Sequence, residues 1–454
     1  MSLRAPAAPS PVLVGALSVI GFALALAFRV VPRWLNGAVD YDEGVYVAGA
    51  WALVHGQLPW RDFVFLHPPG VLLWLAPFTL AGPKLALFLA RAASAVIGSL
   101  NCVLVGRLVG GWGGLAAGFF LATWWECVTT DRGVFLEPLM TFAGLVALTL
   151  AQRNTARAGR LAGIAAGLSC SLKVWGGLWG LAAFLLLERE HRRTFLVAAV
   201  STIAIVVSPF VVAAPGEAFF QSITVHSFRP PDGDLDRWVR LREMFLARSL
   251  DASVLTLVGL PFALVGRLRR LARRALLASV LLVIAFLLAP AWWNQYDAAL
   301  APFLVLVLGC GVHALAVRIG KFGWVAGVVA LAMAARHVEL AVQKPEPMDE
   351  QVKVAAALPP EACAFEIFEV LLADRPPVMT HPILIDSYGQ GLRDATRAGL
   401  RFGSANELFA AEPSQTSYRL QLEQCPALRS GWRGEWQLNA KSKALRDARF
   451  GATP

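Results

Sequence analysis

Residues 39–70 read "VDYDEGVYVAGAWALVHGQLPWRDFVFLHPPG" and place four carboxylates between two long apolar segments. Residues 42–55 have the pattern of a helix that ends at Gly56. The tyrosine, tryptophan and phenylalanine rings along the stretch are typical of a helix that lies in a membrane interface. Pro68 and Pro69 then break the chain before the next apolar run. We therefore expect an interfacial loop that contains more carboxylates than one helix cap requires, namely those of Asp40, Asp42, Glu43 and Asp62.

The composition is that of a membrane protein. The chain has 454 residues, of which 57% are hydrophobic and 16% charged, whereas soluble domains contain about 25% charged residues. Apolar runs of roughly 15–22 residues recur, and a spanning helix needs about 20. The net charge of +10 comes largely from short arginine clusters between these runs. That arrangement is typical of cytoplasmic loops, so we expect no nucleic-acid partner.

The basic clusters also predict the topology, because the positive-inside rule places them in the cytoplasm. They indicate an all-α polytopic membrane protein with about eleven transmembrane helices in residues 1–342. The first run is long for the apolar part of a cleaved signal peptide, so we read it as a helix that stays. A run with a basic cluster on each side is read as two short helices that turn at Lys173, although a re-entrant hairpin satisfies the same charges. The predicted spans are 11–30, 82–106, 113–128, 136–152, 161–172, 174–187, 194–213, 251–266, 276–290, 298–317 and 322–338.

The composition changes near Gln343, where charge and proline content rise and no spanning run remains. Short alternating stretches such as "HPILIDSYG" predict a small α+β domain over residues 343–454. An odd number of spans places this domain outside the cytoplasm. Cys363 and Cys425 could form a disulfide in that oxidising compartment, and two unpaired cysteines are the alternative.

The same topology places nearly all loop acids outside, together with a few cations. Some of these residues have simple structural explanations. Asp40 or Asp42 could be only a helix N-cap, with Glu43 complementing the helix dipole. Glu137 also stands at a capping position, and Lys173 could merely extend to lipid head groups. In the outer loop 214–250, His226 and Arg229 are interpreted as part of a solvated amphipathic helix, although contact with lipid phosphate is the alternative.

Taken together, acids, cations and a tyrosine on one membrane face favour a reaction on a lipid-linked phosphate. A carboxylate can act as general base toward an acceptor hydroxyl, and cationic groups or a metal can stabilise a departing phosphate. A lipid or solute transporter or flippase is the alternative function. It predicts symmetric halves and ionisable residues at mid-membrane depth, whereas here the acids fall in outer loops.

The stretch "DYDEGVYVAGAWALVHGQLPWRDFVFLHPPG" resembles the first outer loop of GT-C membrane glycosyltransferases that use polyprenyl-phosphate sugars, such as protein O-mannosyltransferases and the aminoarabinose transferases of lipid A. Asp42 and Glu43 match the acidic pair of that class, and "HPP" stands where many relatives have "KPP". The segment Asp131 to Leu139 resembles the second acidic motif. "LKVWGGLWGLAAFLL" and "QYDAALAPFLVLVLG" resemble the lysine hairpin and the tyrosine-to-proline segment.

The resemblance implies an inverting transfer of a hexosyl or pentosyl group from a polyprenyl-phosphate donor to a hydroxyl of an envelope glycan, lipid or protein. The enzyme would lie in the plasma membrane with its active site outside the cytoplasm. The resemblance leaves open the use of Mg²⁺ or Mn²⁺, and also whether Asp40 or Asp42 is the base. The implied roles are catalysis for Asp42, Asp40 and Glu43; donor phosphate or lipid binding for His67, Arg132, Lys173 and Tyr296; and acceptor or metal binding for Asp131 and Glu137.

Overall fold

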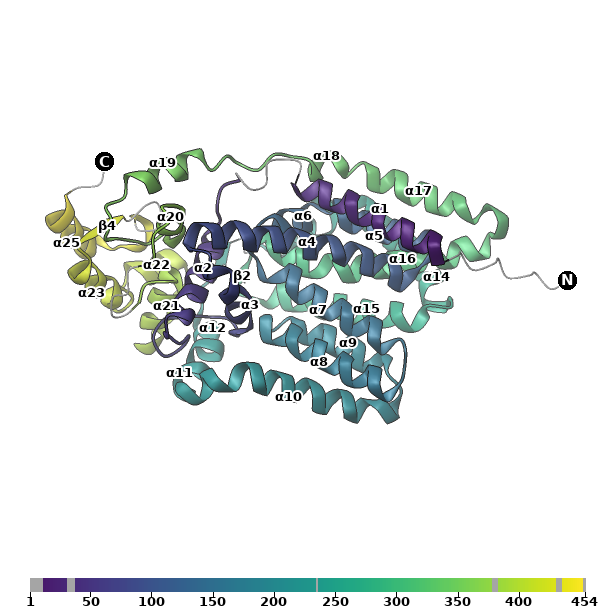
Figure 1. Ribbon diagram of the computed structural model, residues 1–454, viewed down its shortest axis with the longest axis horizontal. Coiled ribbons are helices and arrows are strands. Elements are labelled where there is room, and N and C mark those ends of the chain that lie inside the picture. Colours follow the sequence, from purple (N-terminus) through teal and green to yellow (C-terminus); the bar gives the residue numbers. More distant parts are fainter. Residues whose placement is uncertain (1–10, 31–36, 234–235, 378–382, 430–434, 452–454) are drawn as a thin grey trace.

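The computed structural model describes residues 11–30, 37–233, 236–377, 383–429 and 435–451. Every segment predicted to span the membrane is helical, and the long helices pack side by side along one direction (Figure 1). The break at Trp124 divides one predicted segment into α5 and α6. The helices of this bundle are α1 (Pro11–Val30), α4 (Pro83–Val109), α5 (Gly111–Thr123), α6 (Trp125–Arg132), α7 (Leu136–Ala151), α8 (Ala156–Leu172), α9 (Gly176–Leu186), α10 (Arg189–Ala213), α14 (Leu250–Val265), α15 (Arg269–Leu288), α16 (Asp297–Arg318) and α17 (Gly323–Ala335).

Length and hydropathy select fewer spans than the sequence predicts. Within the described residues, four helices are long and apolar enough to cross a membrane, namely α4, α10, α15 and α16. Two bent pairs would raise the number to six: α6 with α7, which meet at 110°, and residues 237–247 with α14, which meet at 83°. The other apolar stretches, among them Ala16–Val30 of α1, have 10–17 residues, so the total of eleven crossings stays a prediction.

Helix α16 forms the centre of the bundle. Its residues Asp297–Val312 are all buried, as expected for a helix that is apolar on every side. Small residues allow the close approach of its neighbours: a Cβ atom added at Gly311 would lie 2.7 Å from the carbonyl oxygen of Gly259 in α14. Such small-residue contacts are typical of helices that pack within a membrane. In contrast, α10 exposes most of its apolar side chains, as a lipid-facing helix would.

The predicted interfacial helix is α2 (Tyr41–Val54), which lies near one end of the bundle (Figure 1). The His-Pro-Pro turn that follows leads into α3 (Gly70–Thr79). Chain segments from the 214–250 loop and from the start of α16 lie near these elements. They are α11 (Pro215–Phe219), η2 (Phe220–Thr224), α12 (Val225–Phe228), β1 (Asp232–Gly233), α13 (Arg237–Arg242), η3 (Glu243–Ala247), β2 (Ala291–Trp292) and η4 (Asn294–Tyr296).

The C-terminal segment gathers at the α2 end of the bundle (Figure 1). It is mostly helical, and its described residues contain one short parallel sheet, in which β3 pairs with β4. The alternating stretch predicted as a strand makes only a single bridge there, from Ile383 to Phe63. A disulfide joins Cys363 to Cys425, with a Cα–Cα distance of 6.1 Å. After η5 (Gly320–Phe322), the elements are α18 (Val338–Ala341), α19 (Asp349–Ala357), β3 (Ala362–Ala364), α20 (Ile367–Leu372), α21 (Ser387–Arg397), α22 (Ala405–Ala410), η6 (Pro413–Gln415), α23 (Thr416–Gln424), β4 (Ala427–Arg429) and α25 (Ala440–Phe450).

Candidate active site

The two aspartates at the start of α2 have different environments. Asp40 is the exposed N-cap, and its side chain accepts a hydrogen bond from the backbone N–H of Asp42 at 2.9 Å. Asp40 also forms a capping box with Glu43, an arrangement that satisfies N–H groups at a helix start. Asp42 lies within the first turn and is half-buried. The geometry therefore assigns the cap to Asp40.

The contacts of Glu43 do not support its predicted catalytic role. Arg91 of α4 donates two hydrogen bonds to the carboxylate, at 2.8 and 2.6 Å. The backbone N–H groups of Asp40 and Val134 donate two more, at 2.9 and 2.8 Å. The side chains of Glu43 and Arg91 are each only 2% exposed. With four donors on two oxygens, this carboxylate is a structural counter-ion that fixes α2 against α4.

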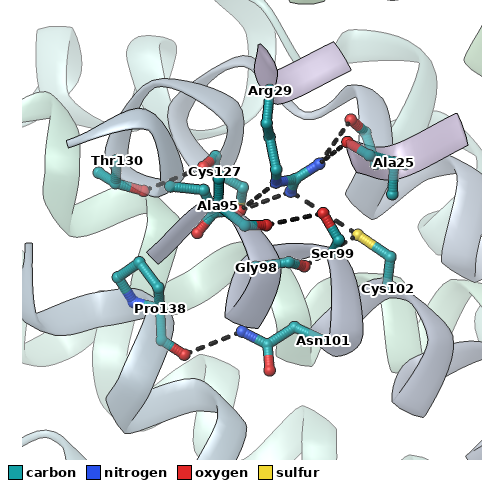
Figure 2. Close-up of polar contacts among 12 residues, drawn as sticks. Ala25, Arg29, Ala95, Gly98, Ser99, Asn101, Cys102, Cys127, Thr130 and Pro138 are labelled. Carbon is teal, nitrogen blue, oxygen red and sulfur yellow. Dashed lines mark hydrogen bonds and ion pairs between the residues drawn. The ribbon is translucent and has the colours of Figure 1, made fainter. Parts of the chain in front are cut away.

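The loop predicted around Asp131 and Arg132 needs correction, because both residues lie in helix α6. Arg29 of α1 donates to Asp131 through Nε at 2.8 Å. Figure 2 shows the guanidinium of Arg29 reaching into the helix bundle, toward Cys102 of α4. Arg132 donates to the carbonyl oxygens of Phe28, Ala341 and Gln343. Both side chains are buried and hold helices together, and their contacts with acceptor and donor stay predictions.

Lys173 and Glu137, to which the resemblance assigned separate roles, form an ion pair. Lys173 caps α8 at the turn before α9, and its ammonium donates to Glu137 at the start of α7. The ammonium nitrogen also lies 5.1 Å from the ring centroid of Tyr296. Burial by itself lowers the pKa of Lys173, but the negative charge of Glu137, with a smaller contribution from Asp42, outweighs that effect and raises the pKa above its ordinary value. Lys173 is therefore a cation at neutral pH.

Tyr46 lies one turn after Asp42 on α2 and is buried. Burial raises its pKa, and the negative charges of Asp42, Glu137, Asp386 and Asp40 raise it further. Its hydroxyl is therefore a neutral hydrogen-bonding group beside the acidic residues. This tyrosine was not selected from the sequence, where it stands among interfacial aromatic residues.

His67, in the turn after α2, lies beside Tyr46 with ring centroids 5.9 Å apart. Burial lowers the pKa of His67, and the positive charges of Lys173, His226 and Arg229 lower it further. His226 of α12 is held by a hydrogen bond between its Nε2 and the carbonyl oxygen of Leu66, at 2.9 Å. Lys173 and Arg229 supply the positive charge of this group, whereas burial lowers the pKa of His67 and of His226 and favours their neutral forms; we call the four residues His67, Lys173, His226 and Arg229 the cationic cluster.

His226 and Arg229 were interpreted from the sequence as parts of a solvated helix, and this was wrong for both. Arg229 is half-buried; its guanidinium lies 3.7 Å from the carboxylate of Asp232, and its guanidinium carbon lies 5.3 Å from the centroid of the Tyr388 ring. One sequence signal could have identified it: Arg229-Pro230-Pro231 repeats the pattern of a basic residue before two prolines that marks His67.

The residues do not fit a resident divalent cation. Such an ion takes several oxygen ligands, and the described residues contain no group of three or more histidine, cysteine, aspartate or glutamate side chains suited to one. The two carboxylates predicted to be metal-associated, Asp131 and Glu137, have Arg29 and Lys173 as their counter-ions. Their charge is already compensated by these cations.

The fold and parts of the sequence are similar to known proteins. The model of glycosyltransferase family 87 matches residues 65–290, and no curated protein sequence matches the chain. ArnT from Cupriavidus metallidurans, solved with bound undecaprenyl phosphate, is similar with a TM-score of 0.59 at 14% identity, over 81% of this chain and 85% of that chain. The apo oligosaccharyltransferase of Archaeoglobus fulgidus has a TM-score of 0.59 at 10% identity, over 92% of this chain and 69% of that chain. Identities this low show a shared fold.

Proposed function

We propose that this chain is a membrane glycosyltransferase of the GT-C class, which the family match over residues 65–290 and the shared fold support. It transfers a sugar from a polyprenyl-phosphate donor to a hydroxyl of a cell-envelope glycan, lipid or protein, with inversion at the anomeric carbon. The observation that carries the proposal is the buried pairing of Lys173 with Glu137 beside Tyr296, with Asp42 among the charges that raise the pKa of Lys173. A base and a phosphate site are the two parts that such a transfer needs.

In the proposed reaction, Asp42 takes the proton of the acceptor hydroxyl while the oxygen attacks the anomeric carbon. A new glycosidic bond forms as the bond between that carbon and the phosphate oxygen breaks, and the polyprenyl phosphate leaves with the bonding electrons. Attack from the face opposite the phosphate inverts the anomeric configuration. Asp42 then releases its proton to water. No other reactant is needed.

The cationic cluster would bind the donor phosphate and stabilise the charge that grows on it as the bond breaks. Lys173 supplies a point charge whose position Glu137 fixes, and Arg229 supplies a planar group suited to phosphate oxygens. His67 replaces the lysine found in many relatives. Its lowered pKa means that it is neutral near pH 7 until a phosphate dianion favours its protonation.

We further propose that the site faces the extracytoplasmic side of the plasma membrane. Two observations support this. The first is the disulfide between Cys363 and Cys425, which is of the kind that forms in oxidising compartments. The C-terminal segment that contains this disulfide packs at the α2 end of the bundle (Figure 1). The arginine clusters between the predicted spans favour the opposite end for the cytoplasm.

The test supplies radiolabelled polyprenyl-phosphate hexoses and pentoses to membranes that contain or lack the protein, followed by identification of the labelled product. Asp42→Asn should lower transfer by about 10²–10⁴-fold, the usual contribution of a general base. Asp40→Asn is the matched control, because asparagine caps helices about as well as aspartate, and it should keep most of the activity. Full transfer activity in Asp42→Asn would refute the assignment of the base.

A further inference from the structure

Tyr388 of the C-terminal segment contacts the cationic cluster from outside the helix bundle. It is the second residue of α21 and is buried, with 8% of its surface exposed. Its hydroxyl donates a hydrogen bond to Asp232 at 2.9 Å, and the guanidinium carbon of Arg229 lies 5.3 Å from the centroid of its ring. The side chain of Tyr388 therefore contacts both Arg229 and Asp232.

Asp232 connects this contact to the rest of the site. Its carboxylate lies 3.7 Å from the guanidinium of Arg229. Its backbone is held by the short parallel pairing of β1 with β2, in which the Asp232 N–H donates to the carbonyl oxygen of Pro290 at 3.1 Å. Strand β2 immediately precedes η4, which carries Tyr296. The loop of Arg229 is thereby fixed to the segment that lies beside Lys173.

The position of Tyr388 is itself fixed against the helix that carries Asp42. The hydroxyl of Tyr41, the first residue of α2, donates to Asp386 at 3.0 Å and accepts from the backbone N–H of Tyr388 at 3.1 Å. Tyr418 of α23 donates to the carbonyl oxygen of Ser387 from the other side. The start of α21 is therefore locked between α2 and the core of the C-terminal segment.

We propose that Tyr388 is a positioning residue for donor binding, acting through Arg229. Its ring supports the flat face of the guanidinium through a cation–π contact. Its hydroxyl occupies an oxygen of Asp232 that would otherwise compete with the donor phosphate for the arginine. The C-terminal segment thus sets the affinity for the lipid phosphate. This inference rests on the proposed function, because it requires that Arg229 bind the donor phosphate.

The experiment measures binding of a polyprenyl monophosphate, without any sugar, to the full chain in lipid nanodiscs. Tyr388→Phe removes the hydroxyl that occupies Asp232 and leaves that carboxylate to compete for Arg229, so the Kd should rise about fivefold. Tyr388→Leu also removes the ring contact, and its Kd should rise by about twentyfold. In steady-state transfer, both variants should raise the donor KM and leave kcat within about twofold, since neither group touches the reacting atoms.

Two further variants separate positioning from general loosening of the segment. Ser414→Ala removes a buried hydroxyl of the same segment that bonds the carbonyl oxygens of Leu408 and Ala411, away from the start of α21, so it should lower stability and leave the Kd unchanged. Tyr388→Phe added to Arg229→Gln should have no further effect, because its action needs the arginine. An equal Kd increase in Ser414→Ala, additive effects in the double variant, or an unchanged Kd in Tyr388→Phe would each overturn the positioning role. An unchanged Kd in Arg229→Gln would instead refute the proposed phosphate role of that arginine.

Discussion

Glu43→Gln separates two roles for the acid that follows Asp42, namely catalysis and support of the fold. The substitution keeps the size of the side chain and removes its charge. In the structure the carboxylate accepts four hydrogen bonds, two of them from Arg91, and both side chains are 2% exposed. We therefore expect a loss of stability, with little effect on the chemistry of the molecules that remain folded.

The magnitude follows from the burial of the pair. Removing one partner of a buried ion pair costs about 3–5 kcal/mol, because the other charge stays in a medium that solvates it poorly. Glutamine also offers one acceptor oxygen in place of two, and a buried donor left without an acceptor costs about 1–3 kcal/mol. These contributions overlap, so the expected decrease in the free energy of unfolding is about 3–5 kcal/mol. That is a large part of the 5–15 kcal/mol typical of folded proteins.

The assay follows tryptophan fluorescence of the purified protein during titration with a denaturing detergent. Arg91→Met and the double variant Glu43→Gln/Arg91→Met complete a mutant cycle. The double variant should lose less stability than the sum of the two single losses, because no unpaired guanidinium remains buried. If Glu43→Gln unfolds at the wild-type midpoint and yet loses transfer activity about 100-fold, Glu43 belongs to the chemistry and the structural reasoning is refuted.

Three other perturbations test the site and its support. Burial and neighbouring cations lower the pKa of His67 below its ordinary 6.5, so the unfolded chain binds more protons at this residue than the folded chain does. The free energy of unfolding should therefore fall as the pH drops from 7.5 to 5.5. His67→Gln should make this fall smaller, as measured by detergent titration at each pH. The Cys363–Cys425 disulfide spans 62 residues, and replacing both cysteines by serine should lower the free energy of unfolding by about 4 kcal/mol; an unchanged midpoint would contradict this. In Gly70→Ala the new Cβ would lie 2.4 Å from a backbone oxygen of α8, costing about 1–3 kcal/mol and lowering transfer, whereas Gly177→Ala, which meets nothing within 4 Å, should be neutral in both assays.

Local patterns predicted the helices well. Every predicted span lies on helix, and the interfacial helix predicted over residues 42–55 is α2, Tyr41–Val54. The predicted turn at Lys173 separates α8 from α9. These features follow from apolar run length, proline and glycine positions and helix-capping residues, all of which are properties of neighbouring residues in the chain. The strand pattern in "HPILIDSYG" failed, because a strand needs a partner and its described part finds only one bridge, to Phe63.

The sequence by itself therefore determined a helical membrane protein, the resemblance of its first loop to GT-C enzymes, and a short list of outer acids and cations. The tertiary structure decided which of them meet. Arg29 reaches Asp131 across 102 residues and Arg91 reaches Glu43 across 48, so these two acids are buried counter-ions, whereas the charge of Asp42 acts on Lys173. Tyr388 and Arg229 come from segments that lie far from the first outer loop in the sequence. A carboxylate has the same chemistry wherever it stands in the chain; the charges and donors that fold around it determine whether it is a base or a counter-ion, and residue spacing does not specify them.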